Sequence, residues 1–333
     1  MTEDGLGRPL QDLRISVTDR CNFRCDYCMP VEKYGDNHEF LPKSEILSFE
    51  EITIIVESML KLGLKKVRIT GGEPLLRKDI CVLISMIRKL DQNLDIAMTT
   101  NGTLLGKYAN KLFEAGLNRV TVSLDAIETE LFKELSSTNI TPQHILSGIE
   151  SAVNAGLPVK INTVIIRSYN EDQIIPLVTN FQSMNIPIRF IEYMDVGGTK
   201  NWNYEQVVTG QEIRDIITDH FGNLSANQRD YYGEVSNYWQ LNDGYIIGFI
   251  ESVSKPFCSS CTRARISANG NMYTCLFAHK GNDLKYLFNL NADKEDIGLA
   301  IKAIWQKRKD RYSEIRGKLS HNPVPVEMHF IGG

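Results

Sequence analysis

The sequence of 333 residues lacks an uninterrupted apolar run long enough to span a membrane, and no block of like charge stands out. Its first residues, MTEDGLGRPLQDLR, lack the basic and apolar regions of a secretion signal. Lys and Arg total 37 against 41 Asp and Glu, which is not the balance of a protein that binds nucleic acid or membranes through a basic surface. We therefore expect a cytoplasmic protein without nucleic-acid or membrane partners.

Cysteine is also scarce, and its distribution is uneven. The chain has seven cysteines, an odd number, and six of them fall into two groups of three. In a chain without a secretion signal, this pattern argues against a disulfide framework and favours metal ligation. The seventh, Cys81, lies among apolar residues in CVLISMIRKL and is expected to pack in the core.

The rest of the chain alternates short β-rich runs with amphipathic helical stretches, which is the pattern of a parallel βα array. Six such runs span residues 13–18, 65–70, 95–100, 119–124, 159–165 and 188–194. Between the first two, Ser48 and Glu51 form a capping-box pair, and Gly63 marks the end of the helix. The pattern predicts an α/β fold with a partial (βα)6 TIM-like barrel over residues 1–200.

Beyond residue 200 the pattern changes to hairpin-like runs. Residues 231–240 and 245–252 flank an Asn-Asp-Gly turn, and residues 264–276 contain an Asn-Gly turn. A helical stretch through Trp305 precedes the C-terminal tail. We expect a smaller C-terminal α+β domain over residues 201–333.

One face of the predicted barrel strands is polar. Because alternate residues of a strand face opposite sides, Arg14, Arg68 and Lys160 fall on the same face as Ser, Thr and Asn residues, whereas Leu, Ile and Val occupy the other face. A closed barrel would fill its lumen with apolar side chains. The pattern favours an open lumen that holds a polyphosphate, since unpaired cations there would be costly. A solvated face of a one-sided sheet is the alternative.

The first cysteine triad, Cys21, Cys25 and Cys28, forms a C-x3-C-x2-C loop directly after the first strand, where barrel enzymes place their active sites. Three thiolates leave one iron of a 4Fe-4S cluster open to a non-protein ligand. In radical chemistry that ligand is the amino and carboxylate group of S-adenosylmethionine. A structural zinc site is the alternative, but it normally needs a fourth ligand, and only His38 lies nearby in the sequence.

The second triad, Cys258, Cys261 and Cys275, has the spacing C-x2-C-x13-C and again lacks a fourth ligand. A cluster held by three cysteines would leave one iron free to bind a substrate atom, such as a purine nitrogen. Zinc remains the main alternative. Arg263 and Arg265 follow on one face of the next strand, where they suit bidentate capture of phosphate. A solvated edge strand is the other interpretation of this pair.

Several motifs carry a resemblance to known enzymes. The first cysteine loop, with an aromatic residue before its last cysteine, resembles the signature of the radical S-adenosylmethionine superfamily, and GGEP at residues 71–74 resembles its cofactor-binding motif. With CSSCTRARIS, a third cysteine in CLFA and a terminal Gly-Gly, the chain resembles the MoaA-type cyclase family of molybdenum cofactor biosynthesis over nearly its entire length. The resemblance implies a lyase with two 4Fe-4S clusters. It would convert GTP to (8S)-3′,8-cyclo-7,8-dihydroguanosine 5′-triphosphate with a 5′-deoxyadenosyl radical.

The resemblance also implies roles for individual residues. The two triads would hold the two clusters: Cys21, Cys25, Cys28, Cys258, Cys261 and Cys275. Contacts with S-adenosylmethionine are expected from Tyr27, Gly72, Glu73, Ser123 and Met194. Contacts with GTP are expected from Arg14, Arg68, Thr99, Lys160, Arg263, Ala264 and Arg265, of which Arg14, Arg263 and Arg265 are also expected to be catalytic. The tail Gly332 and Gly333 resembles a flexible terminus that reaches the active site, although a frayed end fits equally well.

Family membership would imply further partners: a second copy in a homodimer, an unidentified electron donor, and a downstream enzyme that forms cyclic pyranopterin.

Two other functions fit parts of the sequence. A peptide-modifying radical S-adenosylmethionine enzyme would also carry an auxiliary cluster, but it has no evident need for the arginine pair. A non-catalytic zinc-binding module would use the six cysteines structurally, and colourless, zinc-loaded protein would favour it.

Overall fold

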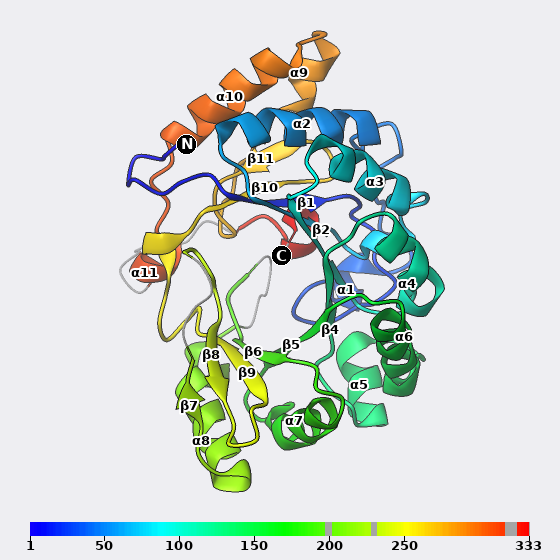
Figure 1. The fold of residues 1–333 in the computed structure, drawn as a ribbon, viewed down its shortest axis with the longest axis vertical. Coiled ribbons are helices and arrows are strands. Elements are labelled where there is room, and N and C mark those ends of the chain that lie inside the picture. The colour runs from blue at the N-terminus through cyan, green and yellow to red at the C-terminus, as the bar shows by residue number, and fades with distance from the viewer. Residues whose placement is uncertain (197–201, 228–231, 317–324, 333) are drawn as a thin grey trace.

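The computed structural model describes residues 1–196, 202–227, 232–316 and 325–332, and its centre is a curved parallel sheet (Figure 1). The six core strands pair in chain order. They are β1 (Asp12–Ser16), β2 (Lys66–Thr70), β3 (Asp95–Thr100), β4 (Arg119–Ser123), β5 (Val159–Ile165) and β6 (Ile188–Glu192). Each lies within one of the runs expected from the sequence, give or take a residue, and the partial (βα)6 barrel is confirmed.

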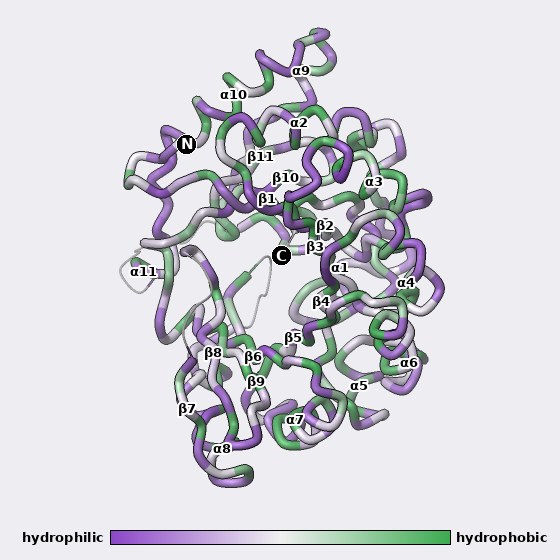
Figure 2. The backbone as a smooth tube through the Cα atoms, in the orientation of Figure 1, coloured by the Kyte–Doolittle hydropathy of each residue, from purple (hydrophilic) through white to green (hydrophobic). Residues whose placement is uncertain are grey.

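Amphipathic helices cover the outer face of these strands (Figure 1). They are α2 (Phe49–Leu62), α3 (Ile80–Leu90), α4 (Leu105–Glu114), α5 (Thr129–Ser136), α6 (Pro142–Asn154) and α7 (Ile174–Ser183). Figure 2 shows hydrophilic and hydrophobic residues mixed along them. Helix α2 begins at the expected capping box, in which the Glu51 amide donates to Ser48 Oγ at 3.1 Å and the Ser48 amide donates to Glu51 Oε2 at 2.6 Å. It ends at Gly63, whose φ of 112° is left-handed.

The main hydrophobic core lies between the sheet and these helices. Alternate strand residues are buried there, such as Leu13 and Ile15 of β1 and Val67 and Ile69 of β2. Burial of an aliphatic side chain of this size contributes about 1.5–3 kcal/mol. The outer face of the sheet therefore stabilises the fold, and the inner face can carry the polar residues that the alternation predicted.

The C-terminal region does not form a separate sheet. Its strands are β7 (Ser225–Ala226), β8 (Asn237–Gln240), β9 (Ile246–Ile250), β10 (Arg263–Ile266), β11 (Asn271–Tyr273) and β12 (Asn282–Asp283). The expected hairpins β8–β9 and β10–β11 are present, but β9 pairs in parallel with β6 and β10 pairs in parallel with β1. The described residues thus form one sheet of twelve strands. Strands from both sides of the predicted boundary near residue 200 thus belong to the same sheet. The division into two domains stays a prediction.

Six further α-helices lie in the described part of the chain. They are α1 (Val31–Tyr34), α8 (Gly210–Phe221), α9 (Lys285–Asn289), α10 (Lys294–Gln306), α11 (Tyr312–Ile315) and α12 (Met328–Ile331). Helix α10 packs against α2 and buries Trp305 (Figure 1). Helix α12 contacts β1, so the end of the chain lies inside the arc of strands (Figure 1).

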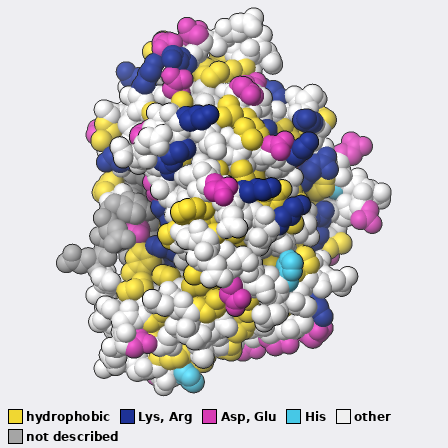
Figure 3. Space-filling view, turned by 45° about the vertical axis from the view of Figure 1, so that its right-hand side comes forward, with side chains coloured by type: hydrophobic (Ala, Val, Ile, Leu, Met, Phe, Trp, Pro, Cys, Tyr) yellow, Lys and Arg dark blue, Asp and Glu magenta, His cyan; other side chains and the backbone are white. Residues whose placement is uncertain are grey.

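The surface carries both signs of charge. On the face shown in Figure 3, basic and acidic side chains are interspersed among polar and apolar ones. Within the described ranges, every helix is too short or too polar to cross a bilayer.

Candidate active site

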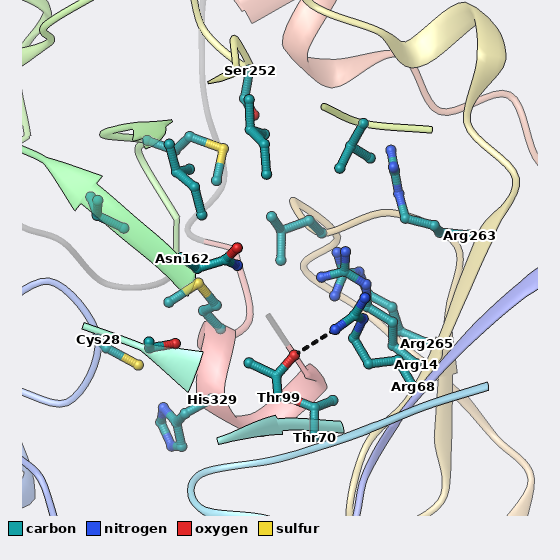
Figure 4. A pocket seen from close by; sticks show the side chains of 18 of the residues that line it. Arg14, Cys28, Arg68, Thr70, Thr99, Asn162, Ser252, Arg263, Arg265 and His329 are labelled. Atoms are coloured by element: carbon teal, nitrogen blue, oxygen red, sulfur yellow. Dashed lines mark hydrogen bonds between the residues drawn. The ribbon is translucent and has the colours of Figure 1, made fainter. Parts of the chain in front are cut away.

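A cavity of about 330 Å³ lies on the inner side of the sheet. Both cysteine triads line it: Cys21, Cys25, Cys28, Cys258, Cys261 and Cys275. Figure 4 shows Cys28 and Arg263 on opposite sides of this space, with Arg14, Arg68 and Arg265 gathered between strands. One cavity therefore reaches both candidate cluster sites and the predicted cationic residues.

The first triad lies in the loop between β1 and α1. The Cys28 amide donates to the Cys25 carbonyl at 2.9 Å, which forms a tight turn around the last two cysteines. Arg24 donates to the carbonyl oxygens of Cys21 at 2.7 Å and Tyr34 at 2.6 Å. The loop is therefore held by its own backbone contacts before any metal binds.

The two glycines that follow β2 pack against the segment that leads into this loop. The Gly72 amide donates to the Thr18 carbonyl at 2.8 Å. A Cβ atom on Gly72 would lie 2.2 Å from the carbonyl oxygen of Arg20, and one on Gly71 would lie 2.5 Å from that of Thr18. The sequence predicted these glycines as a point of approach to the cofactor, and Gly72 does line the cavity. Their close packing also sets the position of Cys21.

Glu73 is fully buried, and its carboxylate accepts three hydrogen bonds. The donors are the amides of Leu75 at 2.9 Å and Asn101 at 2.7 Å, and Thr100 Oγ1 at 2.7 Å. Burial raises the pKa of Glu73 to about 7. Glu73 is not among the residues that line the cavity. It positions Asn101, whose Nδ2 lies 3.8 Å from Cys21 Sγ, and its expected contact with S-adenosylmethionine stays a prediction.

The second triad surrounds the β10–β11 hairpin: Cys258 and Cys261 precede it, and Cys275 follows it. Two guanidinium groups donate to Cys261 Sγ, from Arg263 Nη2 at 3.1 Å and from Arg308 Nη2 at 3.0 Å. Burial by itself would raise the pKa of Cys261, but these two cations lower it to about 6. The thiolate, which is the form that binds metal, is therefore favoured at neutral pH.

Burial has the opposite net effect on four other cysteines. It raises the pKa of Cys21 and of Cys275 to about 11. It also raises the pKa values of Cys25 and Cys28 well above the usual range of a thiol. Metal binding to these thiols must therefore release protons.

The donor set can be tested against the metal groups that the sequence suggested. Among the described residues, no three His, Cys, Asp or Glu side chains converge as ligands of a single metal ion. A cubane cluster makes a different demand, because each cysteine binds a separate iron atom. All six thiols line the cavity, and the thiolate donors that such clusters require are present at both places.

Arginines from adjacent strands face the cavity. The strand register places Arg14 of β1 opposite Arg68 of β2 on one side and opposite Arg265 of β10 on the other. Figure 4 shows these three side chains together. Arg14 Nε and Arg263 Nη1 are buried and have no hydrogen-bond partner among the described residues. Because an unpaired buried donor costs about 1–3 kcal/mol, this arrangement suits an anionic ligand.

The charges of this cluster affect one another. Burial is the main cause that lowers the pKa of these arginines, and repulsion from neighbouring arginines is the second. The pKa falls to about 9 for Arg14 and Arg68 and to about 10 for Arg265. Burial also lowers the pKa of Lys66 to about 8. Although burial raises the pKa of Asp12, the attraction of Lys66, whose Nζ lies 3.3 Å from Asp12 Oδ2, and of the arginines lowers it to about 2. An added anion would relieve the repulsion among these cations.

Three of the residues expected to contact S-adenosylmethionine, besides Gly72, also line the cavity. They are Tyr27, Ser123 and Met194. The Tyr27 hydroxyl donates to Asp125 Oδ2 at 2.5 Å, and Asp125 Oδ1 accepts from the Val164 amide at 2.8 Å. Burial raises the pKa of Asp125 to about 6. The ring of Tyr27 is thus fixed from β4 and β5.

The remaining residues expected to contact GTP have different surroundings. Thr99 lines the cavity and accepts a hydrogen bond from Arg68 Nη1 at 2.9 Å (Figure 4). Lys160 Nζ instead donates to the Tyr238 hydroxyl at 3.1 Å, and Lys160 is not among the lining residues. The side chain of Ala264 packs in the hydrophobic core. Because alternate residues of β10 face opposite sides, its expected contact with GTP would involve the backbone of Ala264, and it stays a prediction.

Sequence reasoning missed several residues that line the cavity. They are Asp12, Lys66, Arg189, Arg308 and His329. Asp12 and Lys66 each stand two residues before a predicted lumen arginine, so the same alternation could have found them. Arg189 donates to Asn162 Oδ1 at 2.9 Å, but the mixed periodicity of its strand gave no signal.

The C-terminal tail enters the same space. His329 lines the cavity, and Arg265 donates a hydrogen bond to the carbonyl oxygen of Gly332. A Cβ atom on Gly332, whose φ is 74°, would lie 2.5 Å from Thr70 Cγ2. The tail as far as Gly332 is therefore packed into the lumen and not frayed, whereas Gly333 lies outside the described residues.

Comparisons with known proteins agree with this architecture. The family model described as Radical SAM superfamily matches residues 15–179, and the one described as Molybdenum Cofactor Synthesis C matches residues 186–314. Among solved structures, Streptococcus suis SuiB bound to S-adenosylmethionine has a TM-score of 0.61 at 18% identity, covering 97% of this chain and 77% of that one. SuiB bound to the precursor peptide SuiA has a TM-score of 0.63, also at 18% identity, covering 96% and 75%. At such identity the likeness concerns the fold alone.

Two curated relatives are much more similar in sequence. A GTP 3′,8-cyclase of Staphylococcus epidermidis is 48% identical, over 99% of this chain and 98% of the relative. A GTP 3′,8-cyclase of Staphylococcus aureus is 47% identical with the same coverage. The resemblance seen in the sequence motifs is thus confirmed across nearly the whole chain. The chain belongs to the radical SAM superfamily and, within it, to the family of the GTP 3′,8-cyclases.

Proposed function

We propose that this enzyme converts GTP to (8S)-3′,8-cyclo-7,8-dihydroguanosine 5′-triphosphate, a reaction of molybdenum cofactor biosynthesis, with both reactants held in the one cavity. One observation supports the proposal most directly. The same cavity is lined by two cysteine triads and by arginines paired across β10, β1 and β2. A cluster-bound cofactor and a triphosphate would each find complementary groups there.

Cys21, Cys25 and Cys28 would hold a 4Fe-4S cluster that binds S-adenosylmethionine. When bound and reduced, this pair supplies a 5′-deoxyadenosyl radical. The protein would orient the cofactor with the Gly72 backbone and the Tyr27 ring, which border the cavity beside these thiols. Ser123 and Met194 are proposed as further contacts.

Arg14, Arg68 and Arg265 would bind the triphosphate of GTP. Guanidinium groups form paired hydrogen bonds with phosphate oxygens, and Arg14 Nε is a buried donor without a partner among the described residues. Fixing the triphosphate on strands β10, β1 and β2 would hold the ribose in one orientation. Such positioning is how a protein brings a particular C–H bond, here at C3′, within reach of the radical.

Cys258, Cys261 and Cys275 would hold a second 4Fe-4S cluster with one iron open to the purine. Arg263 lies next to this triad, and its buried Nη1 has no partner in the described ranges, so it is proposed to contact GTP as well. Thr99 is also proposed to contact GTP, because it accepts a hydrogen bond from Arg68 and so lies beside the proposed phosphate site. An electron donor, a downstream enzyme that forms cyclic pyranopterin and a homodimeric state belong to the proposal on the ground of family membership alone.

The proposal can be tested with GTP that carries deuterium at C3′. The anaerobically reconstituted protein is incubated with this substrate, S-adenosylmethionine and a reductant, and the products are analysed by mass spectrometry. We expect deuterium to leave the nucleotide and to appear in 5′-deoxyadenosine, with ATP as the control nucleotide that is not converted. Formation of 5′-deoxyadenosine at an equal rate without GTP, with the label retained in the nucleotide, would contradict the proposal and favour another substrate, such as a peptide.

A further inference from the structure

A buried cluster of charges outside the cation group described above adjoins the second triad. It consists of Asp4, Arg8 and Arg308, whose side chains are 0%, 1% and 2% exposed. Arg8 Nε donates to Asp4 Oδ2 at 2.7 Å, and Arg308 Nη1 donates to the same oxygen at 3.2 Å. Asp4 therefore links two buried arginines from opposite ends of the chain.

Each arginine reaches backbone next to a cysteine of the second triad. Arg8 Nη1 donates to the Cys258 carbonyl at 2.8 Å. Arg308 Nη1 donates to the Cys261 carbonyl at 2.7 Å, and Arg308 Nε donates to the Thr274 carbonyl at 3.0 Å, one residue before Cys275. All three cysteine-bearing segments are thus connected to one buried charge cluster.

Arg308 also touches a ligand atom itself, since its Nη2 donates to Cys261 Sγ at 3.0 Å. All three of its guanidinium nitrogens are engaged by protein acceptors, and the group lies over the Trp305 ring at 4.5 Å from the centroid. Arg263 differs in this respect, because its Nη1 is buried and finds no partner in the part of the chain that the structure describes. The contacts of Arg308 thus hold protein segments together, whereas Arg263 keeps one N–H donor that a ligand could use.

We infer that Arg308 is a positioning residue for the second cluster: with Asp4 and Arg8 it holds the three cysteine segments in place, and its hydrogen bond to Cys261 Sγ raises the reduction potential of the cluster. The inference rests on the proposed second cluster. Hydrogen bonds to coordinating sulfur withdraw charge from a cluster and are among the features that set its potential. The N-terminal segment of the chain thereby belongs to the second cluster site although it carries none of its ligands.

The test compares Arg308→Lys with the charge-balanced pair Asp4→Asn and Arg308→Gln. The lysine keeps the positive charge but cannot reach four acceptors at once, and the pair removes one negative and one positive charge, so that the net charge of the cluster is unchanged. Arg311→Lys is the matched control, because Arg311 is a nearby exposed residue that pairs with Glu314. The readouts are iron per chain, the rate of iron loss to a chelator, and the potential of each cluster from a redox titration followed by electron paramagnetic resonance.

In both Arg308 variants we expect the second cluster to lose iron about 10 to 100 times faster and to have a more negative potential, while the first cluster is unchanged. The Arg311→Lys protein should match the wild type. About eight irons per chain in every protein, with equal potentials and equal rates of loss, would overturn this inference alone. About four irons in the wild type would overturn the proposed second cluster and this inference with it.

Discussion

The two cysteine triads line one cavity, but the groups around their sulfur atoms differ. In the first triad, the hydrogen bonds of Arg24 within the described residues all go to backbone carbonyls, and burial raises the pKa of all three thiols. In the second, two guanidinium groups donate to Cys261 Sγ and lower its pKa to about 6. The same residue type at the same cavity is therefore placed in two electrostatic environments.

This difference suggests two separate tasks. Cationic hydrogen-bond donors on sulfur stabilise the reduced, more negative state of a cluster, and their absence favours a low potential. The proposed first cluster must deliver an electron to S-adenosylmethionine, for which a low potential is suitable. The second triad adjoins arginines proposed to bind GTP, so the cations there would act on both the thiolate and the substrate.

Substitution of one cysteine in each triad should have the largest effect and should show whether the two triads have different tasks. We expect Cys25→Ala to abolish formation of 5′-deoxyadenosine, because the cofactor loses its cluster. Cys258→Ala should abolish the cyclised nucleotide but retain some cleavage of S-adenosylmethionine, since the first triad is intact. Both products are measured by chromatography, with Cys81→Ser on α3 as the control. Equal loss of both activities in the two variants would argue against a division of tasks.

Arginine substitutions should have the next largest effect, and the two predicted substrate arginines of β10, Arg263 and Arg265, should differ. Loss of a charged hydrogen bond of about 1.5–3 kcal/mol should raise the Kd for GTP about 10- to 100-fold in Arg265→Ala, with both clusters retained. Arg263→Ala should weaken GTP binding and also alter the second cluster, because Arg263 donates to Cys261 Sγ at 3.1 Å. Titration calorimetry and iron analysis check this, with the exposed Lys302→Ala as the control. Unchanged GTP affinity in both arginine variants would contradict their assignment.

A smaller effect is expected from the carboxylate that holds Tyr27 beside the first triad. Burial raises the pKa of Asp125 to about 6 in the folded protein, against about 3.9 in an unfolded chain. Above pH 6 the ionised Asp125 carboxylate therefore lowers the free energy of unfolding, and this destabilisation decreases as the pH falls toward 4. Asp125→Asn can keep both hydrogen bonds but carries no charge. The free energy of unfolding of the variant minus that of the wild type should therefore be about 1 kcal/mol larger at pH 8 than at pH 5. Denaturant titrations at the two pH values measure the difference, and a pH-independent difference would contradict the assignment.

The barrel could be predicted from the sequence because its signals are local. Alternation in strands such as β1 and β2 identified both the buried Leu13 and Ile15 and the lumen-facing Arg14 and Arg68. The joining of β9 to β6 and of β10 to β1 could not be predicted, since it depends on pairing between residues far apart in the chain. No local pattern predicts that strands from both sides of the expected boundary near residue 200 share one sheet, and the boundary itself stays a prediction.

The site was predictable to a similar extent. Spacing located the cysteines, because ligands of one cluster lie close together in the sequence. Alternation predicts which face a side chain occupies but not its neighbours, so Lys160 was expected in the lumen although it bonds to Tyr238. Arg308 and His329 reach the cavity through tertiary packing of distant segments, and no local pattern marks them.

The central claim is that the chain holds two iron–sulfur clusters in one active site, and metal analysis tests it most directly. Iron, acid-labile sulfide and zinc are measured per chain on anaerobically purified protein. We predict about eight irons with matching sulfide and no stoichiometric zinc. About four irons would leave the second triad without its cluster, and zinc without iron would contradict the account as a whole.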